Sequence, residues 1–208
     1  MKKSLVLGIL GLATAAFTSY GQGYMQLDNY LSAGTLVTYG VGVPLNGVSG
    51  PLGTPGNPLN NAWTVGFYWA AGTTGLSEAG GIGLPDASLT LATGAGSTAA
   101  VADAAAVFGI LGEYSSTAVF NSGSTLNTTL TLEVVVYDAA GGSYAGALYR
   151  GHSAAFSMPT AGATSASFPE TGASMPGTLS VGQVPEPTTL ALAGLGGLAL
   201  LLMRRKQS

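Results

Sequence analysis

The chain has 208 residues, of which 47% are hydrophobic and only 7% are charged, and it contains no cysteine. Its formal net charge is −3, from six lysine and arginine side chains against nine aspartate and glutamate side chains. The lack of cysteine excludes disulfide staples, cysteine-ligated metal sites and cysteine nucleophiles, so a folded domain must rely on its hydrophobic core.

Residues 1–21 have the three parts of a secretory signal peptide. Lys2 and Lys3 form a charged start, an apolar run extends from Leu5 to Ala16, and Ser19-Tyr20-Gly21 offers a small-x-small cleavage site, with Thr14-Ala15-Ala16 as an alternative. We expect cleavage by signal peptidase and export through the inner membrane. An uncleaved N-terminal anchor is disfavoured because the apolar run is short for a membrane span.

The segment of residues 22–187, which follows the expected signal peptide, is acidic. Arg150 is its only basic side chain, while it holds all nine acidic ones, so its formal charge is about −8. A duplex-binding protein needs a basic face, so nucleic acid is excluded as a partner. An anionic polysaccharide would be repelled unless a divalent cation bridged the two.

The composition of this ectodomain predicts a mainly β fold. Abundant glycine and threonine disfavour a helical bundle, and the scarcity of charge disfavours ordinary charged disorder. Short β-branched and aromatic segments divided by Gly, Pro and Asn predict an Ig-like or jelly-roll-like β-sandwich over residues 22–160. Residues 161–183, rich in Gly, Ser, Ala and Pro, form an end strand or a stalk. The expected strands are Tyr24–Asn29, Thr35–Val43, Trp63–Ala70, Ser88–Ala92, Ala118–Asn121, Leu126–Asp138, Tyr144–Arg150, Ser153–Met158 and Thr178–Val184.

Two of these strands have a clear period of two. In the first, Trp63, Val65, Phe67 and Trp69 share one face, which we interpret as core rather than as a platform for sugar rings. In the second, Leu126–Asp138, leucine and valine share one face and Glu133 lies on the other. Residues 44–61 and 72–86 are expected to be loops. The Ala-rich residues 98–111, after a Ser97 cap, are compatible with a helix.

No catalytic, cofactor or metal residues are predicted, and we expect a protein that is not an enzyme. His152, the only histidine, lies in Gly-His-Ser without a nucleophile elbow and is interpreted as a surface or turn residue. The carboxylates are interpreted as solvated groups that keep the surface acidic. A Ca²⁺ site at Asp138 beside Gly141-Gly142 remains an alternative, without EF-hand spacing. Carboxylates that meet only in the fold leave open a carbohydrate-active enzyme.

The C-terminal residues 184–208 form a three-part segment. Pro185-Glu186-Pro187 is held extended by its prolines, an apolar run of Leu, Ala and Gly fills most of residues 188–203, and Arg204-Arg205-Lys206 follows. As a helix the apolar run would span about 24 Å, short of the roughly 30 Å hydrocarbon core, with arginine snorkelling making up part of the difference. The basic end predicts a transmembrane helix with a cytoplasmic C-terminus; a buried core helix is the alternative.

This segment resembles the PEP-CTERM sorting signal of Gram-negative bacteria. The matching residues are Pro185, Glu186, Pro187, the apolar helix, and Arg204, Arg205 and Lys206. The resemblance implies processing by exosortase, a membrane-embedded cysteine transpeptidase or protease, with cleavage near Pro-Glu-Pro and delivery to the cell surface or extracellular matrix. A second likeness, of residues 132–156 to a layout found among PEP-CTERM proteins of environmental bacteria, supports the β-sandwich and assigns no activity.

The function expected from the sequence is therefore a structural or adhesive protein of the cell surface or biofilm matrix, anchored in the membrane only before processing. The alternative is a carbohydrate-binding module or carbohydrate-active enzyme acting on exopolysaccharide.

Overall fold

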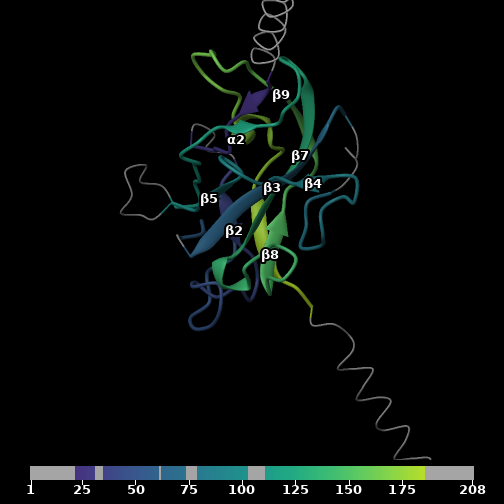
Figure 1. Cartoon of the computed structure of the whole chain (residues 1–208). Coiled ribbons are helices and arrows are strands. Elements are labelled where there is room, and N and C mark those ends of the chain that lie inside the picture. Colours follow the sequence, from purple (N-terminus) through teal and green to yellow (C-terminus); the bar gives the residue numbers. More distant parts are fainter. Residues whose placement is uncertain (1–21, 31–34, 61, 74–78, 103–110, 186–208) are drawn as a thin grey trace, which may run out of the picture.

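The computed structural model describes residues 22–30, 35–60, 62–73, 79–102 and 111–185. In these residues the fold is mainly β, which confirms the expected class (Figure 1). The expected signal peptide at residues 1–21 and the expected membrane helix at residues 188–203 lie outside the described part. The strands are β1 (Tyr24–Met25), β2 (Val37–Tyr39), β3 (Trp63–Ala71), β4 (Thr90–Leu91), β5 (Thr98–Ala100), β6 (Phe120–Asn121), β7 (Thr129–Asp138), β8 (Tyr149–His152), β9 (Phe156–Pro159) and β10 (Leu179–Gln183). Two short helical turns accompany them, η1 (Ala139–Gly141) and α2 (Thr171–Ser174).

An eight-stranded sheet forms the body of the molecule, with the order β2-β10-β8-β7-β3-β4. Strand β5 adds to β3 and strand β9 adds to β7, so each of the two long central strands is flanked by two shorter strands on its outer side. All pairs in this sheet are antiparallel except β2 with β10, which are parallel. The last strand of the chain therefore lies inside the sheet, between an early strand and β8.

The β3–β7 pair holds the centre of the core. The two strands pair along the whole of β3, from Trp63 opposite Asp138 to Ala71 opposite Leu130. As the period of two predicts, Trp63, Val65 and Phe67 are buried. They share the core with the other large apolar side chains, among them Leu130, Leu132, Val134, Val136, Leu179 and Val181.

The small β1–β6 sheet packs on the apolar face of β3. The Phe120 ring meets Phe67 edge-on with 4.9 Å between centroids, and it meets Trp69 at 5.6 Å. Such tilted aromatic pairs contribute about 0.5–1.5 kcal/mol beyond the area that they bury. The large sheet is therefore covered on this face by a second, smaller β layer.

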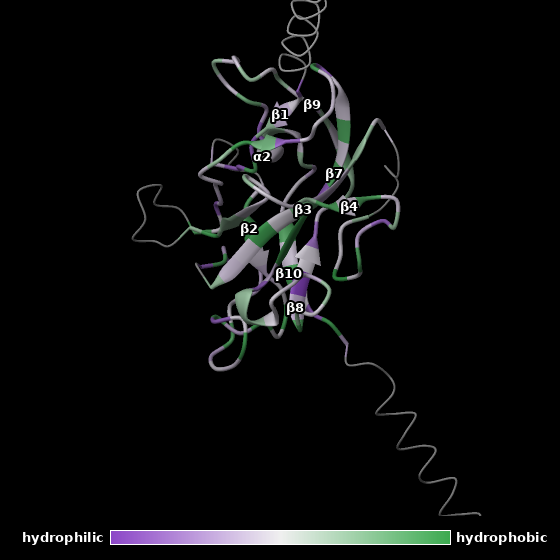
Figure 2. Cartoon of the chain, viewed as in Figure 1, coloured by the Kyte–Doolittle hydropathy of each residue, from purple (hydrophilic) through white to green (hydrophobic). Residues whose placement is uncertain are grey.

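The opposite face of the sheet is covered as well. On β7, Glu133 and Val135 are as fully buried as Val134 between them. Figure 2 shows hydrophobic green on the central strands and a hydrophilic stretch on β8, and the strand order places β8 inside the sheet, between β10 and β7. The segment from residue 79 to residue 89 provides the cover on this side.

The helix expected over residues 98–111 is wrong at its start. Thr98–Ala100 form β5, which pairs with Thr64–Gly66 at the edge of β3. Hydrogen bonds to an open strand edge, and burial of Ala99, override the high helix propensity of alanine, since propensity differences are below about 1 kcal/mol per residue. Residues 103–110 lie outside the described part.

The expected loops and the last strand are found near their predicted positions. Residues 44–60 form no strand of the sheet, but they are folded into a hairpin with a bridge between Pro44 and Leu52. Residues 161–183 contain the short helix α2 and end in strand β10, which belongs to the sheet. In the described residues no helix has the length and apolar character needed to cross a membrane.

Candidate functional site: the C-terminal junction and the buried polar cluster

The chain leaves the sheet at a well-defined junction. Gln183, the last residue of β10, pairs with Tyr149 of β8. One residue later, the Val184 amide donates a hydrogen bond to the Leu148 carbonyl at 2.8 Å, and Pro185 is exposed. The ordered sheet thus reaches the first residue of Pro185-Glu186-Pro187 with no stalk between. Of the other expected signal residues, Glu186, Pro187, Arg204, Arg205 and Lys206 lie outside the described part.

A cluster of ionisable side chains lies under the residue 79–89 segment. It contains Glu133 of β7 with Arg150 and His152 of β8, all buried, and Tyr144 from the turn between these strands. His152 Nδ1 lies 3.3 Å from Glu133 Oε2 and 3.0 Å from the Ser153 carbonyl oxygen. The interpretation of His152 as a surface residue and of Glu133 as a solvated carboxylate is therefore wrong. The strand pairing carries both side chains to one face, which the covering segment closes.

Backbone hydrogen bonds hold the covering segment in place. Gly81 and His152 exchange two of them, at 3.0 and 2.7 Å, as an isolated antiparallel bridge. The Asp86 amide lies 3.4 Å from each carboxylate oxygen of Glu133. The Tyr144 hydroxyl donates to the Gly83 carbonyl at 2.9 Å, and burial raises the pKa of that hydroxyl, with the Arg150 charge acting in the opposite direction. Tyr144 therefore remains a neutral donor at ordinary pH.

Arg150 fastens two loops to β8. Its Nε donates to the Ile82 carbonyl at 2.9 Å, and its Nη1 donates to the carbonyls of Tyr144 and Ala145 at 3.0 and 2.9 Å. The guanidinium carbon lies 5.1 Å from the centre of the Tyr144 ring, in cation–π range. The only lysine or arginine between residues 22 and 187 therefore binds backbone carbonyls of the fold and is not presented to a ligand.

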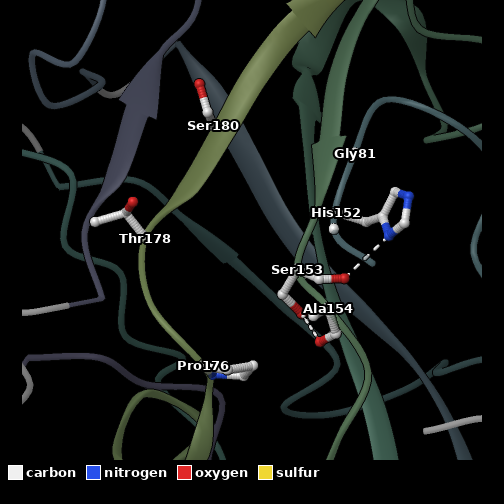
Figure 3. A pocket seen from close by; sticks show the side chains of 8 residues that line it. Gly81, His152, Ser153, Ala154, Pro176, Thr178 and Ser180 are labelled. Atoms are coloured by element: carbon white, nitrogen blue, oxygen red, sulfur yellow. Dashed lines mark hydrogen bonds between the residues drawn. The ribbon is translucent and has the colours of Figure 1, made fainter. Parts of the chain in front are cut away.

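A pocket of about 320 Å³ opens beside this cluster. Figure 3 shows the residues that line it, with His152 and Ser153 on one side and Thr178 and Ser180 of the β10 segment on the other. The Ser153 hydroxyl is already engaged, since it donates to the Ala154 carbonyl at 2.9 Å and accepts from the Val134 amide at 3.0 Å. It holds the backbone of the β8–β9 turn. A serine activated for nucleophilic attack would instead share its proton with the imidazole.

Other carboxylates also have structural partners. Asp138 accepts from the Gly141 amide at 2.7 Å and from the Tyr149 amide at 3.2 Å, so both of its oxygens fix the turn between β7 and β8. Within the described ranges, no group of three or more His, Asp and Glu side chains is arranged to hold a metal ion.

Three acidic side chains lie together near β1. Asp28 is buried and accepts hydrogen bonds from the Tyr30 amide and the Ser115 hydroxyl. Burial, together with the Asp28 charge, raises the pKa of Glu113 and of Glu170. Asp28 and Glu113 are buried rather than solvated, so the sequence interpretation is wrong for them too.

A sequence model of the PEP-CTERM protein-sorting motif matches residues 183–206. The chain carries a PEP-CTERM sorting motif. No curated protein and no solved structure matches the chain significantly. The PEP-CTERM motif implies export, processing by exosortase and delivery to the surface. It begins on Gln183, the last residue of β10, so the sorting motif and the folded sheet share a residue.

The PEP-CTERM motif was readable from the sequence, whereas the buried polar cluster was missed. A usable signal existed for the cluster. Arg150 and His152 are two residues apart in a strand, so they point to the same face, and they are the only arginine and histidine of residues 22–187. Glu133 carried no such signal, because its proximity to His152 depends on the register of β7 against β8.

Proposed function

We propose that the mature protein is a structural or adhesive, non-catalytic component of the cell surface or extracellular polymeric matrix. It is cut by signal peptidase, held transiently in the inner membrane through residues 188–203, and then processed by exosortase. The observation that carries this proposal is the PEP-CTERM motif at residues 183–206, which begins on the final strand of a stable β domain.

The packing of the domain supports a structural role. Trp63 and Phe67, two of the aromatic side chains considered as a platform for sugar rings, are buried and meet Tyr39 and Phe120 edge-on inside the core. Arg150, Ser153 and Asp138 each hold backbone groups of loops. The β1–β6 layer packed on the large sheet is consistent with a sandwich-like ectodomain.

A carbohydrate-binding module, or an enzyme acting on exopolysaccharide, is the second candidate. The observation in its favour is the pocket of about 320 Å³, whose lining includes His152, Thr178 and Ser180. Polar groups converging on a pocket are typical of small-molecule sites. Saturable binding of exopolysaccharide that is lost in Thr178→Val with Ser180→Ala would favour this candidate.

The deciding experiment is intact-mass analysis with cell fractionation, in a host with and without active exosortase. We expect loss of the C-terminal tail near Val184–Pro187, with release or surface display, only in the active host. Replacing Pro185, Glu186 and Pro187 with alanine removes the rigid extended tripeptide and should abolish the cut, whereas the exposed Ser180→Ala should not. A tail that stays intact in the inner membrane of both hosts would contradict the proposal.

A further inference from the structure

Exposed apolar side chains are concentrated at one end of the domain. Among the described residues, nine large hydrophobic side chains are exposed, and five of these lie on residues 40–53 and 139–149. We call this set the apolar end; its members are Val41, Leu45, Val48, Leu52 and Leu148, and Val41 is 83% exposed. Contiguous exposed apolar surface usually marks an interaction site.

The apolar end is also the end from which the chain departs toward the PEP-CTERM motif. Because β2 and β10 are parallel, with Tyr39 beside Val181, both strands leave the sheet in the same direction. The Gly40 amide donates to the Val181 carbonyl at 2.8 Å, and the Val184 amide donates to the carbonyl of Leu148. In Figure 1 the dark-blue loop after β2 and the yellow end of the described chain both lie at the lower end of the molecule.

Hydrogen bonds within the hairpin at residues 44–52 hold Val48 and Leu52 outside the core. The Asn46 side-chain oxygen accepts from the amides of Val48 and Ser49 at 3.1 and 2.9 Å. The Leu45 amide bonds to the Pro51 carbonyl at 2.9 Å, and the Tyr39 hydroxyl donates to the Leu45 carbonyl at 3.1 Å. These hydrogen bonds hold the backbone of the hairpin in a conformation that leaves Val48 and Leu52 exposed.

Gly47 joins the hairpin to the end of β7. Its φ is +73°, and a Cβ placed there would lie 2.9 Å from the Cβ of Asp138. Asp138 in turn accepts from the amide of Tyr149, the residue that pairs with Gln183. The hairpin, the turn after β7 and the exit of β10 therefore form one connected surface.

The apolar end carries no formal charge, although the ectodomain as a whole is strongly acidic. Residues 40–58 and 139–149 contain no Asp, Glu, Lys, Arg or His. An anionic lipid surface would not repel this end as it would the acidic remainder of the domain. Neutral, apolar contact is what a bilayer interface accepts.

The tether to the membrane is short. Three residues, Pro185 to Pro187, separate Val184 from Thr188 at the start of the apolar run. At about 3.3–3.6 Å per residue, the run begins within roughly 14 Å of the Leu148 anchor point. Once the run is in the membrane, the surface around Leu148 must lie close to the lipid headgroups.

We propose that the apolar end docks on the lipid bilayer while the precursor is anchored, so that the domain sits on the membrane with the Pro185 junction at the interface. This inference rests on the membrane insertion of residues 188–203 that is part of the proposed function. Its occupant is the bilayer into which the tether leads, and removal of the tail would release this contact.

The test uses the full chain, reconstituted in vesicles of phosphatidylethanolamine and phosphatidylglycerol. Because the chain has no cysteine, single-cysteine variants carry one environment-sensitive fluorophore each. The test site is Val48→Cys, which is 54% exposed, and the matched control is Leu126→Cys, which is 47% exposed and precedes the opposite end of β7. We expect a blue shift and quenching by nitroxide-labelled lipid at position 48, with neither at position 126.

Alkaline extraction of the vesicles distinguishes membrane anchoring by residues 188–203 from docking of the apolar end on the bilayer. If the chain resists extraction but position 48 behaves like position 126, the docking surface is refuted and the anchor stands. If the chain is extracted, the anchor and the docking both fail. A blue shift at position 48 that follows the protein-to-lipid ratio without quenching would mean contact with a second copy, and it would overturn docking on the bilayer. The variant Val48→Asp with Leu52→Asp should abolish lipid quenching of a fluorophore at Leu45→Cys on the same hairpin; retained quenching would also count against the proposal.

Discussion

At the scale of single residues, Arg150 shows how a charge can serve a fold with almost no other basic groups. Its three hydrogen bonds go to carbonyls of two loops, and its guanidinium lies over Tyr144. Buried carbonyls need donors, and a planar guanidinium supplies several in a fixed geometry, which a lysine ammonium does not reproduce. Arg150 therefore ties the covering segment and the β7–β8 turn to β8.

We expect Arg150→Met to lower the free energy of unfolding by about 3 kcal/mol, because three carbonyls, one in buried and two in partly buried surroundings, lose their donor. Arg150→Lys should cost less, since it keeps a charged donor but cannot bond both loops. Urea unfolding followed by tryptophan fluorescence measures both. The exposed Ser157→Ala of β9 is the control and should shift stability by less than about 0.5 kcal/mol. Equal stability of Arg150→Met and the unmodified protein would show that the loops do not depend on this side chain.

At the scale of elements, the contact between β8 and β10 depends on a glycine. A Cβ at Gly151 would lie 2.2 Å from the Ser180 carbonyl oxygen, which is backbone and cannot rotate away. The two strands can approach this closely only because position 151 has no side chain. The same contact positions β10, and with it the exit of the PEP-CTERM motif.

Gly151→Ala is therefore expected to destabilise the domain by about 2–3 kcal/mol through overpacking. Gly66→Ala in β3 is the matched control, since its nearest neighbour would lie at 3.6 Å, an ordinary contact. Thermal unfolding of both variants gives the comparison. A lower unfolding temperature for Gly66→Ala than for Gly151→Ala would contradict the proposed close approach.

At the scale of the whole molecule, the fold and its sorting motif meet at Gln183, the last residue of β10. Strand β10 bonds to β2 on one side and to β8 on the other, so it is a structural member of the sheet. The described fold ends at Pro185, where the proposed processing begins. Removal of the tail can then leave the sheet intact.

A chain ending after Pro185 should unfold at the same urea concentration as the chain with its tail. A chain ending after Met175 should lose the cooperative transition, because β2 and β8 lose the strand between them. Circular dichroism and urea titration of the two truncated chains are the measurement. Cooperative unfolding of the shorter chain would show that β10 is dispensable, which the sheet order does not allow.

The sequence by itself determined what local pattern and composition control. The period of two in β3 predicted that Trp63, Val65 and Phe67 face the core, because alternate residues of a strand point to opposite faces. The proline tripeptide, the apolar run and the basic end carry their meaning in linear order, so the PEP-CTERM motif needed no fold to be recognised.

Only the tertiary structure decided the features that depend on strand register and on what covers a face. The register of β7 against β8 brings Glu133 to His152, and the residue 79–89 segment buries both. An open edge of β3 turned Thr98–Ala100 into a strand against their local preference. The parallel pairing of β2 with β10 gathered exposed apolar residues from distant loops at the exit of the chain. These contacts join residues far apart in sequence, and no local pattern encodes them.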